Sequence, residues 1–366
     1  MNRFIQRSDG HRLARRLAVF ACSCLIFVSC AHPKYGNLFD TTASSGIAIL
    51  AALLGDGAGT GARIGYSWER TLNPELGFDF NAAAVVYQDV LWILGGANLR
   101  GNPSRESHFS SDGVSFSKLP SGTVPHFAEV YGQPAALAFN GAIYYATHTI
   151  EANGDSRLRI YSTTDAQNFT QRHVYLDATA NTVGEPSLAV YNGRLFVYDF
   201  GQVFYSDDGV AWTNGGSTGI PEDAGVTANG TAVFNGRLVR EYRNRLYVSD
   251  DGISFALAIA GDSRSIFYDH LVFDGRLFSI IESPSGAVGM FETSDLISRT
   301  TISPLNTICC RIGPYTRGRD YAPIVFRDRM RFYKGRESDT LAGSDIYFSL
   351  GGGVGRDGGT HTDFSK

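Results

Sequence analysis

Six hairpin-like apolar segments recur between about residue 82 and residue 350. Each has an apolar strand, a short turn and a second apolar strand, with an aromatic residue directly before the turn. Asn-Gly or Asp-Gly fills four of the six turns, and such dipeptides accept the positive φ angles of tight hairpin turns. The pattern therefore predicts β-strands, with segments that begin at Ala82, Ala135, Ser187, Thr231, His270 and Pro323.

A second pattern follows each hairpin. The segment Ser-Asp-Asp-Gly-Val-Ala-Trp at 206–212 returns at 249–255 and, in related form, at 110–116. Less regular copies lie at 163–169 and 293–295. Asp can bond the backbone of a turn and Gly tolerates positive φ, so each copy predicts a turn between two further strands.

The two patterns together give four strands in about 48 residues, the measure of a propeller blade. The spacing is read from the aromatic residues before the turns, which lie 52, 52, 43, 39 and 53 residues apart. These residues are Tyr87, Phe139, Tyr191, Phe234, Phe273 and Phe326. We predict an all-β fold, one six-bladed β-propeller of four-stranded blades over residues 62–350.

The predicted last blade lacks a fourth strand of its own. Residues 351–366 are rich in glycine, which predicts a disordered tail. An apolar segment around Trp68 precedes the first hairpin and has no partner within its own unit. Because proteins avoid an exposed sheet edge, we expect this N-terminal strand to complete the last blade.

The N-terminus has the pattern of an export signal. Arg12, Arg15 and Arg16 precede the apolar run Leu17–Val28, which is shorter than the roughly 20 residues of a membrane span. The following Ser29-Cys30 resembles the end of a bacterial lipobox, which implies a lipid on Cys30. Residues 1–29 are thus predicted as a lipoprotein signal peptide and 30–61 as a flexible tether. Cleavage after Ala31 is the alternative.

Charge and composition limit the partners. A chain that starts at Cys30 has a formal net charge of −8, which gives no electrostatic reason to bind nucleic acid. We expect an exported monomer in the outer membrane or periplasm that contacts the membrane through its lipid anchor alone. We expect no cofactor.

The hairpins carry a family resemblance. The first one, with Leu91-Trp92-Ile93-Leu94-Gly95-Gly96, resembles a kelch repeat. The Ser-Asp-Gly segments resemble a degenerate Asp-box of the sialidase type, in which Gly here follows Asp one residue early. The resemblance implies an exported bacterial propeller and specifies architecture, not activity.

The mouth of the predicted ring, where each blade's innermost strand begins, is the candidate binding site. The residues six positions before the six aromatic residues, with their neighbours, would place a polar and acidic set there. The candidate ligand-binding residues are Asn81, Gln133, Glu185, Asp269, His270 and Asp320. We expect a non-enzymatic binding module for a glycan or protein ligand.

The sequence gives less support to hydrolysis or calcium binding than to a binding module. Sialidase-like hydrolysis, the alternative function, needs a Tyr nucleophile, carboxylates and clustered Arg. Tyr268 and Tyr321 supply the first type, but Arg311, Arg317 and Arg319 crowd one segment. Calcium needs six or more converging oxygens, and the Asp-Gly turns offer one or two carboxylates each.

The cysteines and histidines do not define a redox or metal site. A copper site of the galactose-oxidase kind would need two His and two Tyr at the mouth, and the histidines to consider near that face are His270 and, less clearly, His126. Cys309 and Cys310 are either two buried thiols, the interpretation we favour, or a strained vicinal disulfide.

Overall fold

The computed structural model describes most of the predicted strands. The described residues are 64–73, 82–96, 105–120, 122, 124–125, 134–150, 153–177, 185–221, 230–243, 245–261, 266–282, 288–304, 321–334 and 344–354. The predicted signal peptide, the tether and Cys30 lie outside them, as do Cys309 and Cys310. Among the described residues, no helix is long and apolar enough to cross a membrane.

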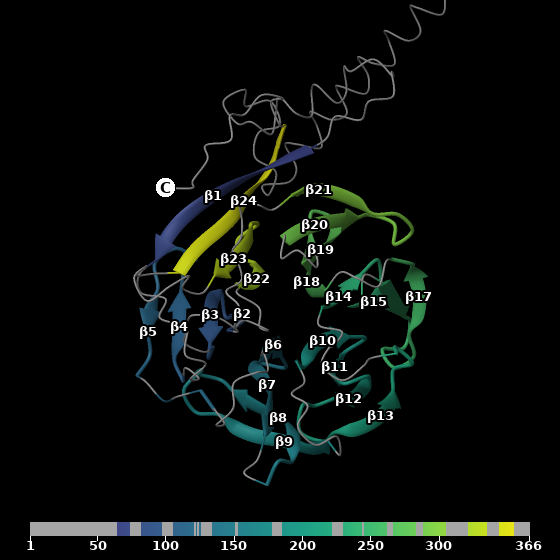
Figure 1. The fold of residues 1–366 in the computed structure, drawn as a ribbon. Helices are drawn as coiled ribbons and strands as arrows, with labels where there is room; N and C mark the ends of the chain where they lie inside the picture. Colours follow the sequence, from purple (N-terminus) through teal and green to yellow (C-terminus); the bar gives the residue numbers. More distant parts are fainter. Residues whose placement is uncertain are drawn as a thin grey trace, which may run out of the picture. The chain divides into compact units, whose positions relative to one another are not determined.

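Five antiparallel sheets are each built from four consecutive strands (Figure 1). The first is β2 (Ala83–Tyr87), β3 (Val90–Leu94), β4 (Ser107–Ser110) and β5 (Ser117–Lys118). The second is β6 (Ala135–Phe139), β7 (Ala142–Ile150), β8 (Ser156–Thr163) and β9 (Thr170–Asp177). The third is β10 (Ser187–Tyr191), β11 (Arg194–Asp199), β12 (Gln202–Ser206) and β13 (Thr213–Ser217). The fourth is β14 (Thr231–Phe234), β15 (Arg237–Tyr242), β16 (Arg245–Ser249) and β17 (Ala256–Ile259). The fifth is β18 (Ile266–Phe273), β19 (Arg276–Glu282), β20 (Val288–Thr293) and β21 (Thr300–Pro304).

The remaining strands join the two ends of the described chain. They are β22 (Tyr321–Val325), β23 (Met330–Lys334), β24 (Ser344–Val354) and β1 (Ile64–Asn73), hydrogen-bonded in the order β1-β24-β23-β22. Strand β24 continues to Val354, past residue 350 where the propeller was predicted to end. Glycine imposes no side-chain restriction on extended backbone, so Gly351–Gly353 do not stop the strand.

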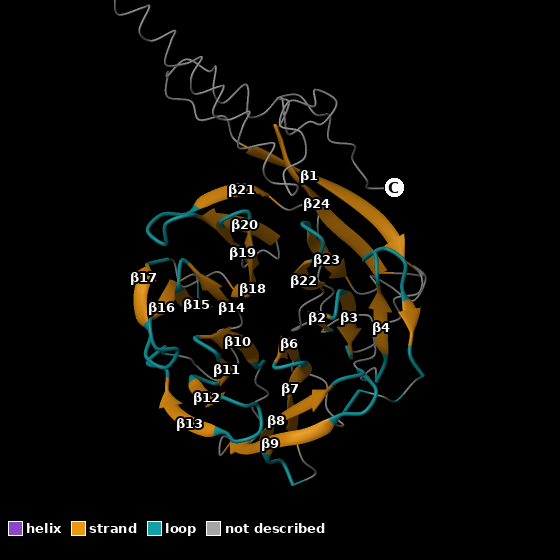
Figure 2. Ribbon diagram, turned by 180° about the vertical axis from the view of Figure 1, so that it is seen from behind, coloured by secondary structure: helices purple, strands orange, loops and turns teal. Residues whose placement is uncertain are grey.

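The chain divides into two compact units, and the strands belong chiefly to Trp68–Ser349. Within this unit the first strands of successive sheets contact one another in chain order, from β2 through β6, β10, β14 and β18 to β22. Strand β22 in turn contacts β2, which closes the circle. An all-β propeller with four-stranded blades is therefore confirmed (Figure 2).

The first turn of each sheet is built as the dipeptides predicted. Asn140, Asn192, Asn235 and Asp274 have φ between 45° and 51°, and the glycine after each also has positive φ. In the two turns without glycine, Gln88-Asp89 and Arg327-Asp328 take the same conformation. Tight turns of this kind match the twist of the strands, which explains why the sequence marks them so clearly.

The five turns centred on Asp112, Asp165, Asp208, Asp251 and Asp295, here called the Asp turns, share one hydrogen-bond scheme. In each, a Ser or Thr hydroxyl donates to the Asp carboxylate, which also accepts the backbone N–H groups two and three residues on. Burial opposes ionisation of Asp112, but the N–H groups of Val114 and Ser115 outweigh it and lower its pKa to about 2. The structure thus confirms that Asp and Ser fasten these turns.

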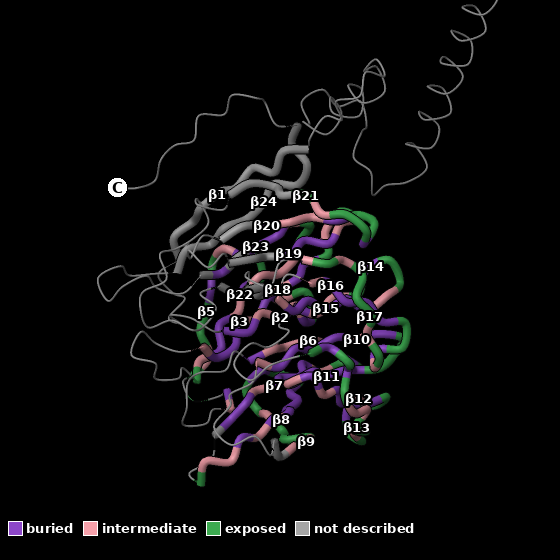
Figure 3. The backbone as a smooth tube through the Cα atoms, turned by 45° about the vertical axis from the view of Figure 1, so that its right-hand side comes forward, coloured by how far each residue is buried: buried purple, intermediate pink, exposed green. Residues whose placement is uncertain are grey.

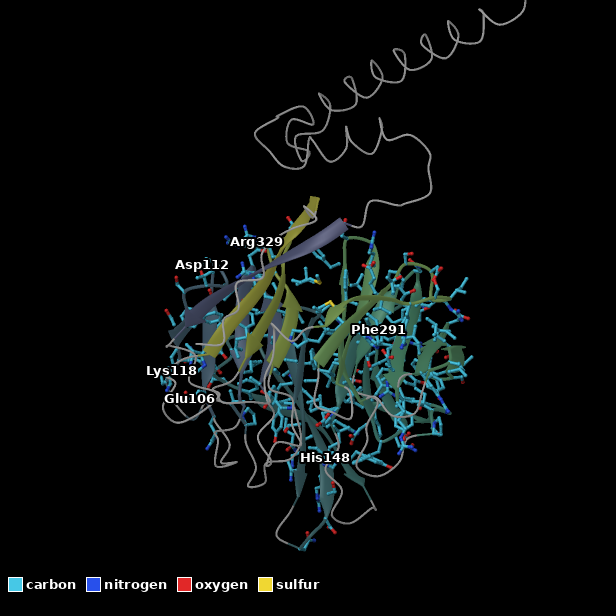
Figure 4. All side chains as sticks on the ribbon, turned by 45° about the horizontal axis from the view of Figure 1, so that its top comes forward. Glu106, Asp112, Lys118, His148, Phe291 and Arg329 are labelled. Atoms are coloured by element: carbon cyan, nitrogen blue, oxygen red, sulfur yellow. The ribbon has the colours of Figure 1, made fainter. Side chains whose placement is uncertain are left out.

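The Asp turns also join neighbouring blades. Tyr198 on β11 donates its hydroxyl to the Gly252 carbonyl at 2.8 Å, and Tyr333 on β23 donates to Gly113 at 2.9 Å. The last contact joins the sheet at the C-terminal end to the first blade, near the labelled Asp112 (Figure 4). Buried positions follow the strands and exposed ones gather at the turns (Figure 3), as expected when sheets pack face to face.

Candidate binding site at the mouth of the ring

A cavity of about 200 Å³ lies where the innermost strands begin. Its walls come from all six of these strands, β2, β6, β10, β14, β18 and β22. The lining is mostly small or apolar: Ala82, Ala83, Ala84, Pro134, Ala135, Ala136, Leu137, Pro186, Ser187, Leu188, Thr231, Asp269, His270 and Pro323. Small residues fit this level, because the innermost strands crowd around one axis.

The structure brings two of the six candidate residues into the cavity wall. Asp269 and His270 line it directly. Glu185 is half-buried and directly precedes the lining residue Pro186, but is not itself part of the described lining. Asn81, Gln133 and Asp320 lie outside the described residues. Of the acidic residues predicted for the mouth, Asp269 is the one that the described lining contains.

Strand β18 differs from the other innermost strands. Its pairing with β19 shifts register between Phe267 and Asp269, as a β-bulge does. The registers of β2, β6, β10, β14 and β22 with their partners run without such a shift over the described residues. A bulge redirects side chains and is frequent beside functional sites. Here it directly precedes Asp269 and His270.

The His270 ring is held on several sides. Ser279 on the neighbouring β19 lies 3.1 Å from its Nδ1, and Glu241 on β15 lies 3.5 Å from its Nε2. Gly230 leaves room for it, since a Cβ at residue 230 would stand 2.6 Å from the His270 Cδ2 atom. The His270 side chain is fully buried, so packing from two blades fixes this ring behind the lining of the cavity.

An ion pair lies behind His270. Arg299 contacts the fully buried Glu241 at 2.6 Å. Burial raises the pKa of Glu241 to about 7, against the opposing effects of the Arg299 charge and of hydrogen bonds from Ser279 and Arg299. Glu241 therefore changes its charge near neutral pH. It contacts His270, which in turn belongs to the lining of the cavity.

This ion pair replaces an aromatic contact. Arg299 occupies the place in its Asp turn that Phe255 and Phe116 hold in theirs, and Glu241 occupies the place of Tyr198 and Tyr333. Those aromatic residues pack edge-on, with ring centroids 5.7 Å apart for Tyr198–Phe255 and 5.3 Å for Tyr333–Phe116. Of these three described interfaces between blades, the one with a polar pair, Glu241–Arg299, is the one next to His270 of the cavity lining.

Sequence reasoning missed Glu241, Arg299 and Ser279. Alignment of the Asp turns could have shown Arg299 in an aromatic position, because Thr293-Ser294-Asp295 had already been recognised as a copy. The partner Glu241 is 58 residues earlier in the chain, so only the packing of two blades brings the two together.

A second buried histidine has similar partners away from the cavity lining. His148 on β7 (Figure 4) contacts Ser156 at 3.0 Å and Asp199 of the next blade at 3.2 Å. All three side chains are buried, which suits a structural link between blades. Among the described residues, no group of three or more His, Cys, Asp or Glu could hold a metal ion.

The groups required for hydrolysis are not assembled in the described part of the mouth. The described lining contains one carboxylate, Asp269, where glycosidases of the usual kind use two. The side chains of Tyr268 and Tyr321, and residues Arg311, Arg317 and Arg319, lie outside what the structure describes.

The fold defines the chain as an all-β propeller protein with a small mouth cavity. No family model matches the chain, and no curated protein matches it. Solved structures with a similar fold include YjhT, at 10% identity and TM-score 0.46, covering 76% of this chain and 96% of that one. A putative glycoside hydrolase from Parabacteroides distasonis has 15% identity and TM-score 0.38, with coverage of 58% and 85%. A mutant β-fructofuranosidase of Bombyx mori in complex with sucrose has 13% identity and TM-score 0.41, with 71% of each chain covered.

Proposed function

We propose that this protein is an exported, lipid-anchored propeller that binds a glycan or protein ligand at the mouth of its ring without transforming it. The observation that carries the proposal is the position of Asp269, next to the enclosed His270, in a cavity otherwise lined by small, largely apolar residues. Binding sites are commonly apolar cavities with a few placed polar groups, and rigid scaffolds present them well.

The proposed architecture is a six-bladed ring of the kelch-like and sialidase-like kind, with β1 as the closing strand of the last blade. Its support is the strand order β1-β24-β23-β22. If β1 closes the blade, amides of β24 are protected on both sides, so hydrogen exchange should be as slow in Tyr347 and Phe348 as in β23. Exchange of every second amide at the rate of an open edge would exclude this closure.

The anchor rests on the lipobox-like Ser29-Cys30 after an apolar run. In bacteria expressing the full chain, palmitate label is expected on the wild type and not on Cys30→Ser. Equal labelling of both proteins would contradict lipidation at this residue.

A binding screen tests the function. The full chain is applied to glycan and extracellular-matrix protein arrays, together with the double variant Glu185→Gln/Asp269→Asn. Binding by the wild type should fall about tenfold or more in the variant, because charged hydrogen bonds contribute roughly 1.5–3 kcal/mol. The matched control is Asp207→Asn/Asp250→Asn, the same charge change at exposed pairs with Arg194 and Arg237, which contribute little. Equal loss in both variants, or none in either, would contradict a site at the mouth.

Sialidase-like glycan hydrolysis is the alternative function. It predicts that array glycans are shortened after incubation, a change that mass spectrometry detects. Unchanged glycans that remain bound favour the binding module.

A further inference from the structure

The first turns of the second, third and fourth blades carry the same dipeptide. They are Asn140-Gly141, Asn192-Gly193 and Asn235-Gly236, and all six residues are exposed. The three asparagines have φ of 45°, 48° and 51°, and a Cβ at any of the three glycines would have nothing within 4 Å. The turns therefore share their backbone, their exposure and the free space around them. They differ in what the asparagine side chain contacts.

In the second and fourth blades, the asparagine amide holds the next blade. Nδ2 of Asn235 donates to the Ser294 carbonyl at 3.1 Å, and Nδ2 of Asn140 donates to the Asp207 carbonyl at the longer distance of 3.5 Å. Ser294 and Asp207 hold equivalent positions, each directly before the central Asp of an Asp turn. The residue before each of these two asparagines is phenylalanine, which has no hydroxyl to reach the same carbonyl.

In the third blade, a tyrosine hydroxyl makes this contact in place of the amide. The Tyr191 hydroxyl donates to the Gly236 carbonyl at 2.9 Å and lies 3.2 Å from the carbonyl oxygen of Asp250, the equivalent position in the fourth blade. Among the described residues, Asn192 makes no hydrogen bond. Its amide is therefore solvated and free to rotate, while the amides of the two equivalent turns are held.

An asparagine followed by glycine can lose its amide without an enzyme. A base removes the backbone N–H proton of Gly193, the nitrogen attacks Cγ of Asn192, and the bond from Cγ to Nδ2 breaks. Nδ2 leaves as ammonia, and a succinimide ring remains. Water then opens the ring at either carbonyl, which gives Asp or isoaspartate. Glycine has no Cβ to hinder ring closure, whereas a hydrogen bond that ties down Nδ2 keeps Cγ from the attacking nitrogen.

We propose that Asn192 is a site of spontaneous deamidation, because Tyr191 makes the contact between blades that the amide makes elsewhere. The Asp product suits the turn, since Asp274-Gly275 has φ of 49° and 68° in the fifth blade. Isoaspartate adds a methylene to the backbone of a two-residue turn, and hairpin register depends on turn length. Its formation breaks the pairing of Tyr191 with Arg194 and loosens the contact with the fourth blade as the protein ages.

The test follows deamidation of the full chain in warm, mildly alkaline buffer. Samples taken over time are digested with trypsin, mass spectrometry measures the replacement of –NH2 by –OH at each asparagine, and electron-transfer fragmentation separates isoaspartate from Asp. Deamidation of Asn192 should be about threefold or more faster than that of Asn235, the order expected when one net hydrogen bond holds the reacting group. Asn140, with its longer hydrogen bond, should react at a rate between these two.

Two reciprocal variants exchange the donors. Tyr191→Phe gives the third blade the Phe-Asn-Gly sequence of its neighbours and leaves the Asp250 carbonyl to the amide, so deamidation of Asn192 should slow about threefold. Phe234→Tyr should speed deamidation of Asn235 by a similar factor. The matched control is Tyr333→Phe, which removes a tyrosine hydroxyl bonded across another interface between blades, to the Gly113 carbonyl at 2.9 Å. This control should leave the rate at Asn192 unchanged.

Three results would overturn the inference. They are equal rates at Asn192 and Asn235, an unchanged or faster rate at Asn192 in Tyr191→Phe, and slowing by the same factor in Tyr333→Phe. None of them bears on ligand binding, because the turn and the mouth lie at opposite ends of β10: Ser187 at its start lines the cavity, and Tyr191 at its end precedes the turn.

Discussion

Replacing Gly209 by Ala should lower the free energy of unfolding by about 2–5 kcal/mol. A Cβ at this position would stand 1.8 Å from the hydroxyl and 2.3 Å from the Cζ atom of Tyr144, a buried residue of the preceding blade. The left-handed backbone, with φ of +78°, adds about 1–2 kcal/mol for any residue with a Cβ. Overpacking of a rigid interface adds a further 1–3 kcal/mol or so. Urea unfolding monitored by tryptophan fluorescence measures the change.

The same blade offers a matched control. Gly193 has φ of +76°, and a Cβ there would have nothing within 4 Å. Gly193→Ala therefore carries the backbone cost of about 1–2 kcal/mol without the clash. The difference between the two variants isolates the contact between blades. If both lose equal stability, Tyr144 does not pack on this turn as the structure has it.

These turns show why much of the fold could be predicted from the sequence. The left-handed positions restrict residue choice so strongly that Gly, Asn and Asp recur there with a visible period. Even the imperfect copies obey the geometry, since Ala166 and Leu296 take φ of 55° and 60° in the place of the glycine. The apolar strands between the turns are visible as continuous apolar runs, because central strands such as β11 and β15 are buried on both faces.

The site was less predictable because its properties arise between blades. Asp269 and His270 were among the candidate residues predicted for the mouth, and both line the cavity. The bulge at 267–269, the space at Gly230 and the Glu241–Arg299 pair depend on contacts between segments far apart in sequence. Comparison of equivalent positions in the repeated hairpins shows that a residue is unusual. It does not show what that residue contacts.

The Glu241–Arg299 pair provides the second large effect. Glu241→Ala should lower the free energy of unfolding by about 3–5 kcal/mol, because it leaves the largely buried Arg299 without its counter-charge. The double variant Glu241→Tyr/Arg299→Phe rebuilds the edge-on aromatic pair seen at Tyr198–Phe255 and should stay within about 2 kcal/mol of the wild type. Thermal and urea unfolding compare the three proteins. A double variant as unstable as Glu241→Ala would show that the two interfaces are not equivalent.

The titration of Glu241 gives another test of the Glu241–Arg299 pair, because it makes the stability of the protein depend on pH. Folding raises the pKa of Glu241 from 4.5 to about 7, so between these values the folded protein binds more protons than the unfolded one. The contribution of Glu241 to stability is therefore fully present below about pH 4.5 and is lost as the pH rises through about 7. The free energy of unfolding should fall more steeply between pH 5 and about pH 8 in the wild type than in the double variant, which has no carboxyl at this position. Parallel curves would mean that Arg299 keeps Glu241 ionised throughout. In that case the buried pair would be a fixed structural link between the two blades.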